Sequence, residues 1–257
     1  MARTPPVTYT RDEMMTVAAA RELRPGMRCF VGVGPPSLAA NLARVTHAPT
    51  IVLIYESGTI GAKPLHLPLS IGDGELAETA DAVVSVPEIF NYWIQPGRID
   101  LGFLGAAQID RYGNINTTVI GSYDQPKVRL PGAGGAPEIA TSAKEVMVIV
   151  KQSRRTFVER LDFVTSVRYL TAGTAHSPAS QDGRSITVVT DLGILRAGLR
   201  THQLTATELH PGVTLAQMQA VTGWPLTAAD GLEEISPPTR EELHALRHLM
   251  AASREPA

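Results

Sequence analysis

The feature that most constrains the fold of this chain is an uninterrupted apolar run from Ile51 to Tyr55. Its sequence, Ile-Val-Leu-Ile-Tyr, favours extended backbone. A strand that is apolar at every position, rather than at alternate positions, is typical of a parallel sheet with both faces covered. Parallel sheets of this kind are built from strands that alternate with helices. The run therefore predicts an α/β protein in which residues 51–55 form a central strand.

Further strand-like segments recur along the chain, separated by helical or glycine-rich stretches. They are Arg28 to Val33, Ala82 to Val86, Ile99 to Leu104, Val146 to Val150 and Ile186 to Val189. This alternation predicts an α/β fold with an open, mostly parallel sheet flanked by helices. We expect a single domain that spans residues 1–257, a length that can bury a sizeable core.

Three helices are indicated by their boundary residues and by apolar spacing. Thr10 and Glu13 form a capping box before the first helix, and Gly26 marks its end. A second, short helix follows the turn at residues 34–37, and a third covers Thr239 to Ser253. The apolar faces expected for the last two helices comprise Leu38, Leu42 and Val45, and Leu243, Leu246 and Met250 respectively. Between them, Thr171 to Ser185 predicts a long loop or an inserted excursion.

The composition excludes several classes of protein. The chain has 44% hydrophobic and 19% charged residues and a formal net charge of -2, so no basic excess suggests a nucleic-acid partner. Cys29 is the only cysteine and lies in an apolar run, which predicts a buried thiol without a disulfide. The seven histidines show no ligand-like spacing, so we expect no metal site. No run resembles a signal peptide or reaches transmembrane length, and we expect a cytoplasmic protein without membrane contact.

Glu56 is the first candidate for chemistry because it directly follows the run at residues 51–55. In open α/β sheets, ligands bind beyond the carboxyl ends of the strands. Gly58 and Gly61 follow Glu56 and would let a ligand approach the backbone closely. From these residues alone, a helix-capping or salt-bridged carboxylate is an equally open interpretation.

Two further segments could contribute to the same site. Pro131 to Pro137 holds three glycines in four positions, at Gly132, Gly134 and Gly135, so that consecutive amides could converge on an anion. A flexible turn is the alternative interpretation. The segment Gly105 to Asn116 follows a predicted strand and would place Gln108, Asp110 and Asn114 at the same edge of the sheet. Dinucleotide-binding, Walker-type and Gly-x-Ser-x-Gly motifs are not found in the sequence.

Residues 56–61, Glu-Ser-Gly-Thr-Ile-Gly, resemble the Glu-x-Gly-x-x-Gly signature of family I CoA-transferases, in which the glutamate is the nucleophile. The serine after the glutamate is similar to the glutaconate CoA-transferase branch. The resemblance continues through residues 105–121, 126–129, 132–136, 155–158, 162–166, 189–194 and 209–214. Within the branch, residues 54–58, 61–64 and 67–80 are most similar to the B subunits of 3-oxoadipate CoA-transferases.

This resemblance implies a function in which Glu56 carries CoA from succinyl-CoA to 3-oxoadipate as an enzyme-bound glutamyl-CoA thioester. It also implies the B-subunit fold, a hetero-oligomer with an A subunit, acyl-CoA and dicarboxylic acid substrates, and no metal or organic cofactor. The residues expected to bind CoA or an oxyanion are Gly58, Gln108, Gly134, Gly135 and Ala136.

Three alternatives to this function stay open in the sequence. The first is a transferase for another short dicarboxylate, such as glutaconate. The second is a CoA-thioester C–C hydrolase of the steroid-ring-degrading kind, and the third is a module that binds an acyl-CoA without catalysis. One segment departs from the family, because Thr171 to Ser185 lacks its usual glycine-, leucine- and proline-containing pattern.

Overall fold

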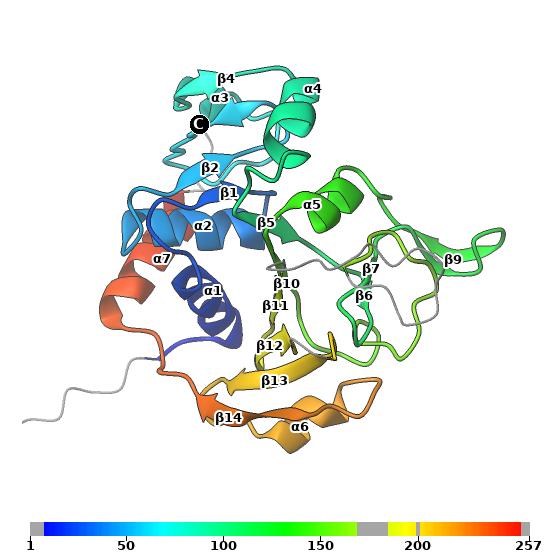
Figure 1. Cartoon of the computed structure of the whole chain (residues 1–257). Coiled ribbons are helices and arrows are strands. Elements are labelled where there is room, and N and C mark those ends of the chain that lie inside the picture. Colours follow the sequence, from blue (N-terminus) through cyan, green and yellow to red (C-terminus); the bar gives the residue numbers. More distant parts are fainter. Residues whose placement is uncertain (1–7, 169–184, 199–200, 253–257) are drawn as a thin grey trace, which may run out of the picture.

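A computed structural model describes residues 8–168, 185–198 and 201–252. Its main sheet has ten strands: β1 (Arg28–Phe30), β2 (Val52–Ile54), β3 (Thr59–Ile60), β4 (Ala82–Val83), β5 (Leu101–Leu104), β10 (Glu145–Ile149), β11 (Ser185–Val189), β12 (Gly193–Ala197), β13 (Leu204–Leu209) and β14 (Ala228–Glu234). They lie in the order β14-β13-β12-β11-β10-β5-β1-β2-β3-β4 (Figure 1). The five central strands, β11 to β2 in this order, are parallel, which confirms the predicted α/β fold.

Both edges of the sheet differ from the prediction. The segment Ala82 to Val86 forms only a two-residue exposed strand, β4, because Ser85 caps the short helix α4 (Val86–Glu88). In the centre of the sheet, the strand expected from Arg28 to Val33 is present as β1 but ends at Phe30. β12 pairs antiparallel to both β11 and β13, whereas β14 pairs parallel to β13 and is mostly exposed. The sequence predicts none of the strands β12, β13 and β14, since they lack a continuous apolar run.

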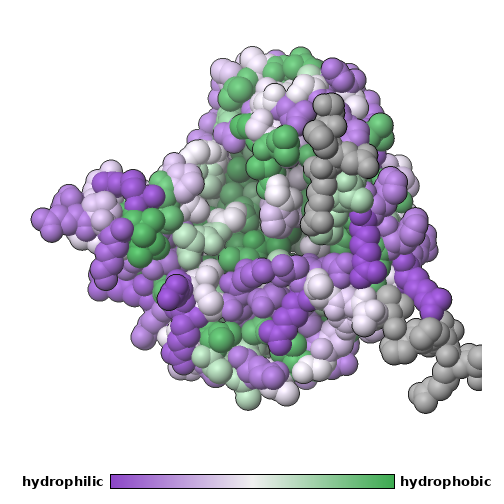
Figure 2. Space-filling model, turned by 180° about the vertical axis from the view of Figure 1, so that it is seen from behind, coloured by the Kyte–Doolittle hydropathy of each residue, from purple (hydrophilic) through white to green (hydrophobic). Residues whose placement is uncertain are grey.

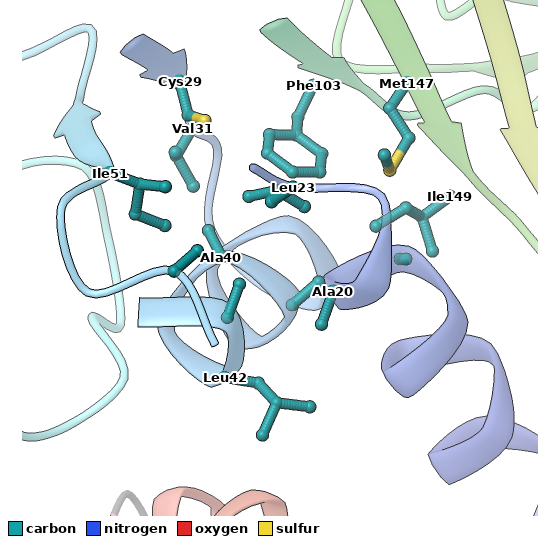
Figure 3. Close-up of a cluster of buried hydrophobic side chains, with 14 of the residues drawn as sticks. Ala20, Leu23, Cys29, Val31, Ala40, Leu42, Ile51, Phe103, Met147 and Ile149 are labelled. Carbon is teal, nitrogen blue, oxygen red and sulfur yellow. The ribbon is translucent and has the colours of Figure 1, made fainter. Parts of the chain in front are cut away.

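One face of the sheet is covered by α1 (Arg11–Arg21), α2 (Pro35–Val45) and α7 (Arg240–Ala252), as Figure 1 shows. Both hydrogen bonds of the capping box between Thr10 and Glu13 are present. Side chains of β1, β5 and β10, such as Phe103 and Met147, meet side chains of α1 and α2, such as Ala20 and Leu42, in a buried cluster (Figure 3).

The predicted apolar helix faces are largely correct, with one exception. Leu243 and Leu246 are buried in α7, whereas Val45 at the end of α2 is 47% exposed. Small residues, mainly alanines, form most of the buried face of α2, so that this helix can approach the sheet closely. Cys29 is buried on the same side, and burial raises the pKa of its thiol to about 12, which confirms the structural interpretation.

The opposite face of the sheet carries a second buried cluster. Val146 and Val148 of β10 point into it, whereas Met147 and Ile149 join the first cluster. Alternate residues of one strand therefore enter two cores, which explains why the central strands are apolar throughout. This second face is covered by η1 (Ile89–Ile94, a π-helical segment), α5 (Ala136–Ser142) and α6 (Leu215–Ala220).

Smaller elements complete the described chain. Two separate hairpins pair β6 (Gln108–Ile109) with β7 (Ile115–Asn116), and β8 (Val119–Gly121) with β9 (Pro126–Arg129); α3 (Gly74–Glu78) lies near β4. None of the helices described is long and apolar enough to cross a membrane. The loop expected from Thr171 to Ser185 falls outside the described residues, except for Ser185, which begins β11.

Candidate active site

A pocket of about 320 Å³ lies at the carboxyl ends of three neighbouring parallel strands, β5, β1 and β2. Gly32 follows β1, Glu56 follows β2 and Gly105 follows β5, and all three line this pocket. The chain passes from β1 to β2 on one side and places β5 on the other side of β1. The pocket therefore lies beside a topological switch point, where open α/β sheets bind their ligands.

Glu56 is positioned by a tight turn at the end of β2. The amide of Gly58 donates to the carbonyl of Tyr55 (3.0 Å), and the amide of Tyr55 donates to the carbonyl of Thr59 (3.0 Å). Gly58 has a φ of 109° and lies so close to Val84 that an added Cβ would be 1.9 Å from the Val84 carbonyl oxygen. Only glycine fits here, because both the backbone angle and the space exclude a side chain. Gly58 therefore shapes the turn that presents Glu56.

The glycine loop, which we define as residues 131–135, forms the opposite wall of the pocket. Gly132 and Gly134 have φ values of 103° and 49°, and Gly135 precedes α5 as its N-cap. A Cβ added to Gly135 would lie 3.1 Å from Oε1 of Glu56, so the carboxylate lies against this glycine. Within the described residues, the amides of Ala133, Gly134 and Gly135 donate to no protein acceptor. They are free to bind an anion or a developing oxyanion.

The carboxylate of Glu56 makes no hydrogen bond and no ion pair in the described parts of the chain. The helix-capping and salt-bridged interpretations left open by the sequence are therefore not supported. Among the described residues, Glu56 is the only ionisable one that lines the pocket; the other walls are apolar side chains such as Phe30 and Phe103 and the glycine loop. No group of histidine, cysteine, aspartate or glutamate side chains in the described residues is arranged to hold a metal ion. An unpaired carboxylate in such surroundings is available for reaction with a ligand.

Gln108 lies in β6 and does not line the Glu56 pocket. Its side chain donates to Asp162 (3.0 Å) and accepts from the side-chain amide of Asn116 (2.8 Å). Asp110 and Asn114 likewise bond to each other within the hairpin of β6 and β7. The structure thus brings Glu56, Gly134, Gly135 and Ala136 together and places Gln108 apart from them, within a buried hydrogen-bond network.

An adjoining pocket of about 360 Å³ shares the glycine loop with the Glu56 pocket. Thr117 and Ala107 line only this second pocket, whereas Gly132 and Ala136 line both. Sequence reasoning missed two residues near Glu56: Ile71, which lines its pocket, and Phe90, which packs against Gly135. Ile71 lies in the segment 67–80 that carries the family resemblance, but an aliphatic side chain there gave no sign of lining the site, and Phe90 lies outside the recognised motifs.

Comparisons with known proteins agree on one family. Residues 12–220 match the family model described as Coenzyme A transferase. The chain is 60% identical to the B subunit of 3-oxoadipate CoA-transferase from Pseudomonas knackmussii over 244 residues, which cover 95% of this chain and 94% of that protein. The solved structure of glutaconate coenzyme A-transferase from Acidaminococcus fermentans superposes with a TM-score of 0.86 at 29% identity, covering 97% of this chain and 99% of that one. A cholesterol ring-cleaving hydrolase IpdB subunit of Mycobacterium tuberculosis is 29% identical, with 93% of each chain covered.

Proposed function

Because this chain belongs to the coenzyme A transferase family, we propose that it is the subunit that carries the nucleophilic glutamate of a 3-oxoadipate CoA-transferase. The reaction moves CoA from succinyl-CoA to 3-oxoadipate. The observation that carries the proposal is the unpaired carboxylate of Glu56, which lies against the glycine loop in a pocket at the strand ends, where the amides of residues 133–135 make no hydrogen bond in the described chain.

The reaction proceeds by two exchanges at Glu56. The Glu56 carboxylate attacks the thioester carbonyl of succinyl-CoA, the carbon–sulfur bond breaks, and a mixed anhydride and the CoA thiolate form. The thiolate then attacks the glutamyl carbonyl and releases succinate, which leaves a glutamyl-CoA thioester. A carboxylate of 3-oxoadipate reverses both steps and leaves as its CoA ester, while Glu56 returns to the free carboxylate. Covalent catalysis thus divides one difficult exchange into easier steps.

The amides of Gly134 and Gly135 supply the donors for the oxyanions of these steps. Each attack turns a carbonyl oxygen into an oxyanion, and preorganised backbone donors stabilise it without reorganisation. Loss of one such donor typically costs about 3 to 4 kcal/mol in the transition state. Gly58 acts by shaping the turn at Glu56, and Ala136 lines the same pocket. Gln108 contributes by holding the neighbouring hairpin, since its side chain is fully engaged with protein groups. No metal or organic cofactor takes part.

The chain acts in a hetero-oligomer with an A subunit. The relatives from Pseudomonas knackmussii and Acidaminococcus fermentans are both named as B subunits. Large apolar side chains also lie exposed near α3 and β4, including Leu65 at 71% and Leu69 at 87%. Figure 2 shows hydrophobic side chains on this upper part of the molecule and in a hollow beneath it. Such surfaces are typical of protein interfaces. The complex is cytoplasmic, where its CoA substrates occur.

The hydrolase alternative has weaker support than the transferase. Identity is 60% to the 3-oxoadipate enzyme subunit and 29% to the ring-cleaving hydrolase subunit over similar lengths. A non-catalytic acyl-CoA module would have no need for an unpaired carboxylate beside free amides.

The proposal is tested by the intact mass of this chain, co-purified with its A subunit and incubated with succinyl-CoA without an acceptor. We expect an added mass equal to CoA less water, located at Glu56 by peptide mapping and released by 3-oxoadipate. An adduct that glutaconate but not 3-oxoadipate releases would replace the proposed acceptor. An unmodified chain in a complex that still binds succinyl-CoA would refute the covalent mechanism.

A matched pair of variants separates chemistry from folding. Glu56→Gln retains the shape of the side chain but removes the nucleophilic oxygen, and should abolish both adduct and turnover. Glu56→Asp withdraws the carboxylate by one methylene, and a misplacement of about 1 Å can cost about a hundredfold in rate. Normal turnover by the Gln variant would exclude Glu56 as the nucleophile.

A further inference from the structure

The glycine loop is held in place by hydrogen bonds from a residue outside it, Thr117. The Oγ1 of Thr117 donates to the carbonyl of Gly132 (2.8 Å), and the amide of Gly132 donates to the carbonyl of Thr117 (2.9 Å). Both bonds hold Gly132, whose φ of 103° lies in a region that residues other than glycine rarely adopt. Because Gly132 and Gly134 can adopt many backbone conformations, the glycine loop keeps one geometry only if contacts from outside the loop, such as these two bonds, fix it.

Thr117 is itself fixed from behind. Its amide donates to Oγ1 of Thr165 (2.9 Å), and the same oxygen lies 2.7 Å from Oγ1 of Thr118. Thr165 in turn donates its amide to the carbonyl of Ile115 in β7 (2.9 Å). A continuous series of hydrogen bonds therefore links the hairpin of β6 and β7 to Gly132.

The bond to the Gly132 carbonyl also determines the direction of the next amide. No cis peptide bond occurs in the described chain, and in a trans peptide the carbonyl and the following N–H point in opposite directions. Because the Gly132 carbonyl faces Thr117, the N–H of Ala133 is directed away from it. The two residues that follow, Gly134 and Gly135, line the pocket, and Gly135 lies against Glu56.

We propose that Thr117 is a positioning residue, whose hydroxyl holds the glycine loop in the conformation that aims its free amides at the reacting group. This inference rests on the proposed function, because it assigns Thr117 a role in stabilising the oxyanions formed at Glu56. It assigns Thr117 no contact with the reacting atoms themselves.

The test is Thr117→Val beside Thr117→Ser, each assembled with the A subunit. Valine keeps the shape but replaces the donating oxygen by a methyl group, whereas serine retains the donor. For the valine complex we expect kcat to fall about tenfold, the equivalent of one neutral hydrogen bond, with KM for succinyl-CoA within about twofold. The serine complex should keep a kcat within about twofold of the wild type. A role in folding alone would lower the amount of complex or its unfolding temperature, and would not produce this split between kcat and KM.

A wild-type kcat in the valine complex, or a serine complex as slow as the valine complex, would overturn the proposal. If the valine chain does not assemble, Thr117→Ala removes the same bond and is compared with serine in the same way. Glu56→Gln is assayed in parallel. Turnover by that variant would refute the proposed function, whereas its inactivity beside an unimpaired valine complex would refute the role of Thr117 alone.

Discussion

Gly135→Ala is the most informative single change at this site, because it adds one methyl group between Glu56 and Phe90. The φ and ψ of Gly135 are −82° and 0°, which alanine adopts without strain, so the effect is steric. The added Cβ would lie 2.8 Å from Cζ of Phe90 and 3.1 Å from Oε1 of Glu56, whereas ordinary contacts begin near 3.4 Å. Phe90 must therefore yield by about 0.6 Å and the carboxylate by about 0.3 Å, or the loop must retreat by a similar amount.

These displacements should lower the catalytic rate. If a misplacement of about 1 Å costs about a hundredfold, a shift of about 0.3 Å costs about fourfold and one of about 0.6 Å costs about fifteenfold. We expect kcat to fall within this range. Overpacking against Phe90 should lower the free energy of unfolding by about 1 to 3 kcal/mol.

The assay is the rate of adduct formation with succinyl-CoA, followed by intact mass, together with steady-state kcat and urea unfolding. Gly231→Ala is the matched control, because a Cβ at Gly231 meets nothing within 4 Å and Gly231 has no positive φ. It should leave both rate and stability close to those of the wild type. A Gly135→Ala complex that forms the adduct at the wild-type rate would refute the placement of Glu56 against this glycine.

Three further predictions concern stability, each measured by urea unfolding of the chain. Gly58→Ala should cost at least about 3 kcal/mol, because its Cβ would clash with the Val84 carbonyl at a φ of 109°; a cost below about 1 kcal/mol would contradict the turn described. Arg168→Met should lower the free energy of unfolding by about 3 kcal/mol or more, since four backbone carbonyls would lose the charged donor of the buried guanidinium. An unchanged urea midpoint would exclude this stabilising role of Arg168. Burial lowers the pKa of His210 from 6.5 to about 4, against attraction by Asp191, so the unfolded state binds the proton more readily. The contribution of neutral His210 to the free energy of unfolding is complete above about pH 6.5 and falls by about 1.4 kcal/mol per pH unit towards about pH 4. His210→Gln should flatten this pH dependence of the free energy of unfolding, and an unaltered pH dependence would refute the assignment to His210.

Much of the central fold and the position of Glu56 were predictable from local sequence. A strand apolar at every position has to be covered on both faces, and such a strand in a parallel sheet directs its carboxyl end to the ligand-binding edge. Glu56 follows that strand directly, so its place at the edge depends on chain order alone. The capping box of α1 and the burial of Cys29 were predictable for the same reason, since both depend on residues close in sequence.

The sheet edges could not be predicted in the same way. β14 has a polar sequence and is a strand because β13 offers it hydrogen-bonding partners, which is a long-range condition. β4 is cut short by the cap at Ser85, where a local hydrogen bond prevails over the strand preference of the valines that flank it. Gln108 follows a strand in sequence, yet its side chain is turned into a polar network with Asp162, 54 residues away.

The sequence by itself determined the central parallel strands, the position of Glu56 just after β2, and the glycines of the loop at residues 131–135. Each of these features depends on residues that are neighbours in the sequence. Only the tertiary structure decided that Gly135 lies against the carboxylate, that Phe90 packs behind it and that Thr117 holds the loop. These contacts join residues that are 15 or more positions apart, and their distances follow from how the sheet, α5 and the hairpins pack together.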